Sequence, residues 1–101
     1  MRLFVILSPT NVWGTKTEYT ELRNFLIKDG YLRIAPEVFM RIVQNRKTSL
    51  KHYKRIKEHA PKTGTVRLLR MTENQYKTTY YVTGKKDYQE KTVGNNSHIV
   101  I

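Results

Sequence analysis

The order in which strand and helix signals follow one another constrains the fold of this chain more than any other feature of its sequence. Arg2–Leu7 is continuously apolar after its first residue, as expected of a central strand covered on both faces. Two amphipathic helical segments and four further strand-like segments follow, in the order β-α-β-β-α-β-β. Two right-handed crossovers around a hairpin give the split βαβ, or ferredoxin-like, arrangement. We therefore predict an α+β protein with a ferredoxin-like βαββαβ core and an additional C-terminal strand.

Capping residues and glycines mark the boundaries of the predicted elements. Thr15 and Glu18 fit a capping box at the start of the first helix, and Gly30 suits the left-handed position after its end. Thr48 or Ser49 is expected to cap the second helix. The predicted strands are Arg2–Leu7, Tyr31–Ile34, Glu37–Val43, Thr65–Met71 and Thr78–Thr83. The residues expected to face the core from the two helices are Tyr19, Leu22, Phe25, Leu26, Leu50, Tyr53, Ile56 and Ala60.

The fifth strand, Thr78–Thr83, has no position in a four-stranded ferredoxin-like sheet. Its apolar residues need a partner, and a second copy of the chain is the simplest one. We therefore predict a symmetric homodimer. The 101 residues are enough for one domain. We assign residues 1–86 to this domain and 87–101 to a C-terminal tail, in which His98–Ile101 has the composition of a terminal strand.

The charge of the chain favours an anionic partner. Nineteen Lys and Arg against eight Asp and Glu give a formal net charge of +11. Between Arg41 and Arg70 the only acidic residue is Glu58, and the rest of the charge there is basic. A field of one sign concentrates polyanions near the surface, so nucleic acid is the favoured partner. An acidic protein and a merely solvated basic face remain as alternatives.

Several protein classes are excluded or disfavoured by composition. There are no cysteines, so neither a disulfide framework nor a cysteine-based zinc site is available. No apolar run approaches the roughly 20 residues of a membrane span. The apolar N-terminal stretch is too short for a secretory signal and lacks a small-residue cleavage site. We expect a cytoplasmic protein that does not bind membranes.

The sequence offers no self-contained active site. His52 and His59 are expected on the surface of the second helix, separated by two turns or about 10 Å, which is too far to share a metal ion. The acidic residues are scattered, and no pair has the spacing of a metal site. We therefore expect no catalytic residue, no metal and no cofactor. Most tyrosines are expected to pack in the core or on strands, among them Tyr19, Tyr53, Tyr80 and Tyr81.

Two motifs resemble those of a known family. Phe25–Tyr31 reads Phe-Leu-Ile-Lys-Asp-Gly-Tyr, and Pro61–Tyr76 reads Pro-Lys-Thr-Gly-Thr-Val-Arg-Leu-Leu-Arg-Met-Thr-Glu-Asn-Gln-Tyr. These blocks resemble the CRISPR-associated Cas2 family of type II systems, which is the non-integrase subunit of the spacer-acquisition complex. The resemblance extends from about Arg2 to Lys86 without an insertion, and the Pro61–Tyr76 block is its specific part.

The resemblance implies a function and a set of partners. Family members form a symmetric dimer that joins two dimers of the Cas1 integrase, and prespacer double-stranded DNA lies across the assembly. Phosphate contacts are implied at Lys16 and at the pair Lys85 and Lys86. Phosphate contacts position DNA without reading its sequence, so lysine is sufficient. A weaker candidate on the second helix consists of Lys51, Lys54 and Arg55.

The family places a metal-binding Asp two residues before a proline at the end of the first strand. Counting back from Pro9 puts Leu7 there, with Ser8 beside it, and neither can replace a carboxylate as a Mg²⁺ ligand. We therefore expect a DNA-holding scaffold. The alternatives are a metal-dependent endonuclease of the same family and a toxin ribonuclease of the VapD type, which shares the fold.

Overall fold

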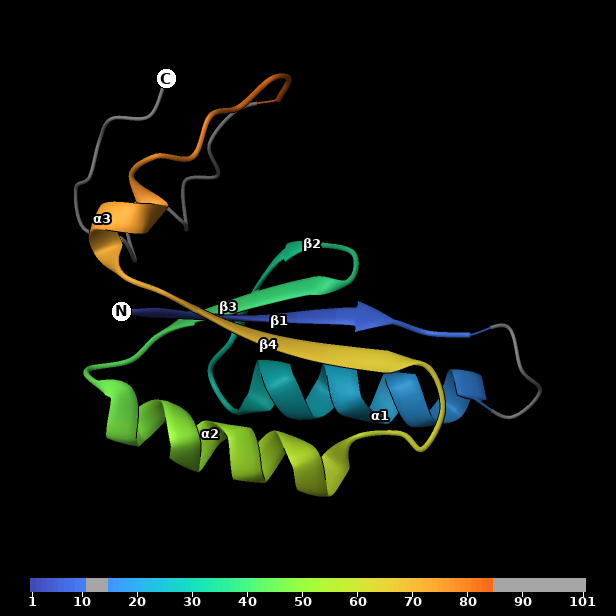
Figure 1. Ribbon diagram of the computed structural model, residues 1–101. Helices are drawn as coiled ribbons and strands as arrows, with labels where there is room; N and C mark the ends of the chain where they lie inside the picture. Colours follow the sequence, from blue (N-terminus) through green and yellow to red (C-terminus); the bar gives the residue numbers. More distant parts are fainter. Residues whose placement is uncertain (11–14, 85–101) are drawn as a thin grey trace.

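Four antiparallel strands form one sheet in the computed structural model of the chain, which describes residues 1–10 and 15–84 (Figure 1). The strand order is β2-β3-β1-β4, so β1 is central and pairs on its two sides with β3 and β4. The strands are β1 (Arg2–Ser8), β2 (Leu32–Ala35), β3 (Val38–Ile42) and β4 (Thr65–Met71). This order and the intervening helices confirm the predicted α+β, ferredoxin-like fold.

Two long helices, α1 (Thr15–Lys28) and α2 (Arg46–His59), lie side by side on one face of the sheet and run in opposite directions (Figure 1). Alternate residues of β1 point toward them, and Leu3, Val5 and Leu7 are buried in the core that results. Tyr19, Leu22 and Leu26 are buried there from α1, as predicted. No helix within residues 1–10 and 15–84 has the length and apolar character that crossing a membrane would need.

The opposite face of the sheet is only partly covered. A single helical turn, α3 (Glu73–Tyr76), begins at Thr72 with a capping box and places Tyr76 against Phe4 and Met40. Residues 77–84 then run above this face of the sheet without joining it as a strand (Figure 1). The predicted strand Thr78–Thr83 forms no ladder with any described residue of this chain, and the side chain of Val82 is 95% exposed. Leu69 and Ile42 remain exposed on the same face as Phe4.

The second helix differs from its prediction in its start and in its buried face. Asn45 is the N-cap, and its side chain accepts a hydrogen bond from the backbone N–H of Thr48, so neither Thr48 nor Ser49 caps the helix. Leu50 and Tyr53 are exposed rather than buried. The residues that face the core are Ser49, His52 and Ile56.

The physical reason for this rotation lies in the charges that share a face with Leu50 and Tyr53. Arg46 lies one turn before Leu50, and Lys57 lies one turn after Tyr53, so burying that face would also bury two cations. The buried polar side chains find local partners instead. The Ser49 hydroxyl donates to the carbonyl oxygen of Arg46, and His52 lies beside Asp29. The histidine predicted at the surface is therefore 5% exposed.

Backbone geometry confirms the left-handed position predicted for Gly30, which has φ of 96° after the end of α1. The register between β2 and β3 shifts between Arg33 and Ala35. Gly64, in the turn before β4, has φ of 75°. A Cβ atom there would collide with the hydroxyl of Tyr19 and lie 2.8 Å from the carbonyl oxygen of Ser8. The turn into β4 therefore requires glycine.

Candidate nucleic-acid interface

The outer surface of α2 carries a row of free cations. Lys47, Lys51 and Lys54 are exposed and follow the i, i+4, i+7 spacing of one helix face, opposite the buried stripe through His52. None of the three forms an ion pair with another residue of the described part of the chain. With Leu50 they line a shallow concavity of about 500 Å³. We call Lys47, Lys51 and Lys54 the lysine row.

The structure separates the three residues that the sequence grouped on this helix. Lys51 and Lys54 belong to the lysine row, whereas Arg55 lies on the side of α2 that faces Asp29. Its Nη2 lies 2.5 Å from Oδ1 of Asp29, so its charge is largely occupied within the protein. Lys16 lies in the first turn of α1, but its side chain, like Lys85, Lys86 and the predicted tail, is outside the described residues.

Asp29 is the centre of a buried ionic cluster that joins three elements. Its side chain is 8% exposed at the end of α1, between Arg55 and His52 of α2 and Arg41 of β3. Arg41 also donates to the backbone carbonyl of Asp29. Since a carboxylate that loses its partners in the interior is costly, this cluster holds the end of α1, α2 and β3 together.

Burial shifts the titration of two neutral members of the cluster. Desolvation raises the pKa of Tyr31 to about 12, with the negative charge of Asp29 adding to the effect. Burial lowers the pKa of His52 below its ordinary value, and the positive charge of Arg41 lowers it further, while Asp29 opposes both. His52 is therefore neutral at physiological pH and acts as a packing residue rather than as a cation.

A second buried cation fixes α3 on the opposite face of the sheet. Arg2 is fully buried, and its Nε lies 3.1 and 3.2 Å from the two carboxylate oxygens of Glu73. The guanidinium stacks over the ring of Tyr76 at 3.6 Å, and Nη1 lies 3.3 Å from the sulfur of Met40. The position of α3, and so the point from which residues 77–84 leave the sheet, is set by these contacts.

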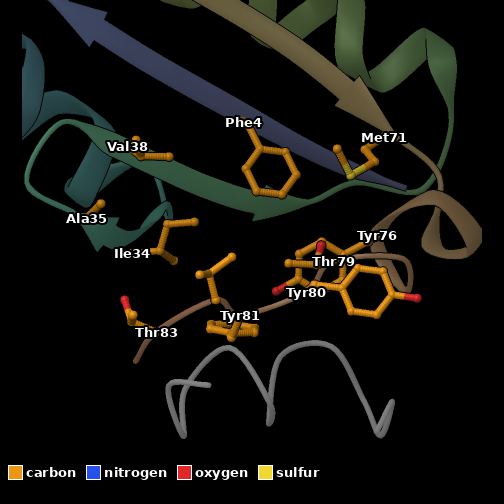
Figure 2. Close-up of a pocket in the computed structure, with 11 residues that line it drawn as sticks. Phe4, Ile34, Ala35, Val38, Met71, Tyr76, Thr79, Tyr80, Tyr81 and Thr83 are labelled. Atoms are coloured by element: carbon orange, nitrogen blue, oxygen red, sulfur yellow. The ribbon is translucent and has the colours of Figure 1, made fainter. Parts of the chain in front are cut away.

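An apolar groove lies between this face of the sheet and residues 79–83 (Figure 2). Its volume is about 490 Å³, and Phe4, Ile34 and Val38 form its floor while Tyr80 and Tyr81 stand opposite them. Tyr80, predicted as a packed strand residue, is 73% exposed. As far as residues 1–10 and 15–84 are concerned, the groove is therefore open and mainly apolar.

The end of β1 is where the family resemblance implies a metal-binding Asp, and this chain has Leu7 and Ser8 there. Leu7, the position predicted from the spacing to Pro9, is buried among the helices and cannot present a side chain to solvent. Ser8 is the exposed residue, and Nη1 of Arg67 lies 3.3 Å from its Oγ. A guanidinium thus occupies the neighbourhood of this strand end. Residues 1–10 and 15–84 contain no group of three His, Cys, Asp or Glu side chains that could hold a metal ion.

The ionic cluster around Asp29 is the part of the molecule that the sequence did not predict. In the sequence Asp29 is only the residue before Gly30, at the end of the predicted first helix. Its partners lie 12 to 26 positions away along the chain and follow no shared spacing. The one residue in the sequence that could have indicated a buried polar cluster was His52, which lies one helical turn before the apolar Ile56.

These features define a class of protein: a small ferredoxin-like α+β protein with a strongly basic helical layer and an open apolar face. No protein-family model matches the chain. Proteins named CRISPR-associated endoribonuclease Cas2 do match it. One from Ligilactobacillus salivarius is 34% identical over 87 residues, which cover 85% of this chain and 86% of the relative. One from Acidovorax ebreus is 34% identical over 94 residues, covering 92% of each chain.

A third relative of the same name, from Streptococcus mutans, is 28% identical over 88 residues and covers 86% of this chain and 81% of its own. Matches at this level extend across nearly the whole described fold. The chain belongs to the Cas2 family of CRISPR-associated proteins. The resemblance carried by Pro61–Tyr76 is thereby confirmed.

Replacing Leu7 and Ser8 in turn by Asp tests which of them could present a carboxylate. Leu7→Asp would place a charge in the core and should lower the free energy of unfolding by about 3 kcal/mol or more. Ser8→Asp, at an exposed position, should change it by less than about 1 kcal/mol. Urea unfolding followed by circular dichroism measures both. Equal stability of the two variants would show that Leu7 is not buried as described.

Acidification should destabilise the protein through His52. In the unfolded chain His52 takes up a proton near its ordinary pKa of 6.5, whereas in the folded protein it does so only at lower pH. The unfolded state therefore binds more protons once the pH falls below about 6.5, and stability decreases as the pH drops further until the folded protein also takes up the proton. The urea midpoint of the His52→Gln variant should no longer fall with pH in this range. The His59→Gln variant, which replaces an exposed ring, should keep the pH dependence of the wild type. An unchanged slope in the His52 variant would contradict the assignment.

Proposed function

We propose that this protein is the DNA-holding subunit of a CRISPR spacer-acquisition complex. In this role a symmetric dimer bridges Cas1 integrase dimers in the cytoplasm and holds prespacer double-stranded DNA through phosphate contacts. Residues 1–86 form the Cas2 domain, and 87–101 form its C-terminal tail. The observation that carries the proposal is the exposed end of β1, where Nη1 of Arg67 lies beside Ser8 and the described residues form no group of three His, Asp or Glu that could hold a metal ion.

The dimer is supported by the uncovered face of the sheet. A chain of this size gains much of its stability by burying such a face, and the groove beside Phe4 is lined by apolar side chains. Val82 and Tyr80 are exposed on residues 77–84, which form no ladder with the part of the chain that the structure describes. Placing this segment on the sheet of a second copy would cover both surfaces at once.

The DNA contacts proposed from the family resemblance are Lys16, Lys85 and Lys86, with Lys51, Lys54 and Arg55 on α2 as a second group. The formal charge of +11 supports an anionic partner. Since lysine contacts phosphate as a point charge, the binding would be independent of sequence.

A second candidate function is favoured by the printed name of the relatives, which are called endoribonucleases. A metal-dependent nuclease would need carboxylates close to the scissile phosphate. At the end of β1 the exposed residue is Ser8, and Glu37, whose backbone carbonyl accepts from the N–H of Leu7, has its carboxylate bound to Arg23. The scaffold is therefore the better supported function. Membership of the Cas2 family likewise favours it over a toxin ribonuclease of the VapD type.

Duplex binding should depend steeply on salt and not on sequence. If about six phosphates are neutralised, affinity falls on the order of a thousandfold between 50 and 200 mM salt. Replacing Lys85 and Lys86 together by Ala should weaken binding to all sequences alike and flatten the salt dependence. Fluorescence anisotropy with unrelated duplexes, for the free protein and for its complex with Cas1, measures this. Light scattering on the same sample reports whether the free protein is a dimer. If the double variant lost affinity for one sequence only, Lys85 and Lys86 would contact bases rather than phosphates.

The purified protein should show no metal-dependent cleavage of nucleic acid. Single- and double-stranded DNA and RNA are incubated with Mg²⁺ or Mn²⁺ and, in parallel, with EDTA, alongside an unrelated protein purified in the same way. Cleavage that co-purifies with this protein and is abolished by EDTA would favour the nuclease over the scaffold. The Ser8→Asp variant, which introduces an exposed carboxylate at the end of β1, is assayed for cleavage in parallel as the matched comparison.

A further inference from the structure

The second helix carries apolar residues on two different sides. Ile56 is buried against the core, whereas the side chains of Leu50 and Tyr53 remain 55% and 47% exposed. A helix that packs on a single core keeps its apolar residues in one stripe. Leu50 and Tyr53 are three positions apart, so they lie on the same side of the helix and about one turn from each other. Neither the core of the fold nor the proposed phosphate contacts account for this apolar pair.

The same side of α2 has a cation beyond each end of the pair. Arg46 lies four positions before Leu50, and Lys57 lies four positions after Tyr53. Both cations are exposed, and neither forms an ion pair with a residue of the ranges 1–10 and 15–84. Nζ of Lys57 lies 5.9 Å from the centre of the Tyr53 ring, so the two side chains adjoin. We call Arg46, Leu50, Tyr53 and Lys57 the α2 flank.

The α2 flank is turned away from the first helix. Arg55 follows Tyr53 by two residues, or about 200° around the helix, and is bound to Asp29 at the end of α1. His59 lies one turn further along the same side as Arg55, and its ring stacks on Phe25 of α1 with 3.8 Å between the ring centres. α1 therefore lies on the opposite side of α2, beside which it runs (Figure 1). Within the described part of the chain, the flank is left to solvent.

The charges around the apolar pair decide which partner would cover it. Lys47 and Lys54 also border Leu50, and the single acidic residue of α2, Glu58, comes after the last residue of the flank. A second copy of the chain, with its formal net charge of +11, would bring further cations to this side. Phosphates would pair with the cations but would leave the aliphatic Leu50 without a partner. A membrane surface would need a much larger apolar face. An acidic protein surface with an apolar centre complements both the cations and the pair.

We propose that the α2 flank binds an acidic amphipathic helix of another protein. From Arg46 to Lys57 the flank extends about 17 Å at 1.5 Å per residue, which corresponds to about three turns of a partner helix. Leu50 and Tyr53 would pack among apolar side chains that recur every three or four positions on that helix, and acidic side chains beside them would pair with the cations. The concavity of about 500 Å³ beside Leu50 gives room for a partner side chain. The inference is independent of the proposed DNA-holding role.

Binding of a designed peptide to the full-length protein tests this proposal. The probe is a labelled helical peptide of about 20 residues, with leucines every three or four positions and glutamates on both sides of them. Fluorescence anisotropy should give a Kd on the order of 10 μM. Two control peptides, with serine in place of every leucine or lysine in place of every glutamate, should bind at least about tenfold more weakly. In nitrogen–proton correlation spectra of the wild-type protein, the peptide should shift the signals of residues 46–57.

A matched pair of variants isolates the apolar contact. Leu50→Ser should weaken peptide binding by at least about tenfold, because it removes an anchor from the centre of the interface. Ile27→Ser removes a side chain that is 50% exposed on α1, close to the exposure of Leu50, and should change the affinity by less than about twofold. Since both positions are exposed, the thermal midpoints of both variants should stay within about 3 °C of the wild type.

A second matched pair isolates the charged rim. Arg46→Gln combined with Lys57→Gln should weaken peptide binding and make it less dependent on salt. Lys28→Gln combined with Lys62→Gln removes the same charge from exposed positions outside the flank and should leave both properties nearly unchanged. Equal losses in the two double variants would show that only net charge matters and would overturn the proposal.

The remaining outcomes each decide against the α2 flank as a protein-binding surface. Wild-type protein that binds no peptide at about 1 mM would overturn it. Equal binding of the serine-substituted peptide would show that the apolar pair contributes nothing. Shifts confined to the groove beside Phe4 would place the peptide on the sheet instead. If Leu50→Ser lost as much affinity for duplex DNA as for the peptide, the flank would be a nucleic-acid surface.

Discussion

The buried carboxylate of Asp29 is the interaction on which the arrangement of the helical layer depends. It lies between cations from α2 and β3 and beside His52, so it fixes the end of α1 and the rotation of α2 at the same time. Breaking a buried pair by removing one partner typically costs about 3–5 kcal/mol, because the remaining charge stays buried. With Arg55 and His52 held inward, the lysine row must face outward. An interior ion pair thereby determines which cations of α2 are available to a partner.

The two faces of the sheet use buried charge in parallel ways. Under the helices a carboxylate is surrounded by arginines, and on the other face Arg2 is surrounded by Glu73, Tyr76 and Met40. Each arrangement attaches an element that hydrophobic packing alone would leave poorly specified. The first sets the rotation of α2, and the second sets the position of α3. Both surfaces proposed to meet partners are therefore positioned by polar contacts rather than by the central apolar core.

Local rules predicted the parts of the fold that depend on neighbouring residues. The continuous apolar run of β1 and the left-handed Gly30 follow from short-range chemistry, and the ferredoxin-like order follows from the succession of strand and helix signals. The predicted buried face of α2 was wrong. Leu50 and Tyr53 have the character of core residues, but Arg46 and Lys57 lie on the same side of the helix and keep that face in solvent. The cluster around Asp29 could not be predicted, since contacts between distant positions leave no spacing in the sequence. The phosphate contacts at Lys85 and Lys86 stay predictions.

The placement of β1 at the centre of the sheet also has a consequence for how the chain is made. β1 comes first in the sequence, but its partner β4 ends at Met71, and the contact from Arg2 to Glu73 joins residues 71 positions apart. The central strand therefore has a free edge during most of synthesis, because one of its two neighbours does not yet exist. Such non-local pairing slows folding and leaves apolar strand edges exposed to other chains. Nascent copies of this protein should depend on chaperones until β4 has left the ribosome.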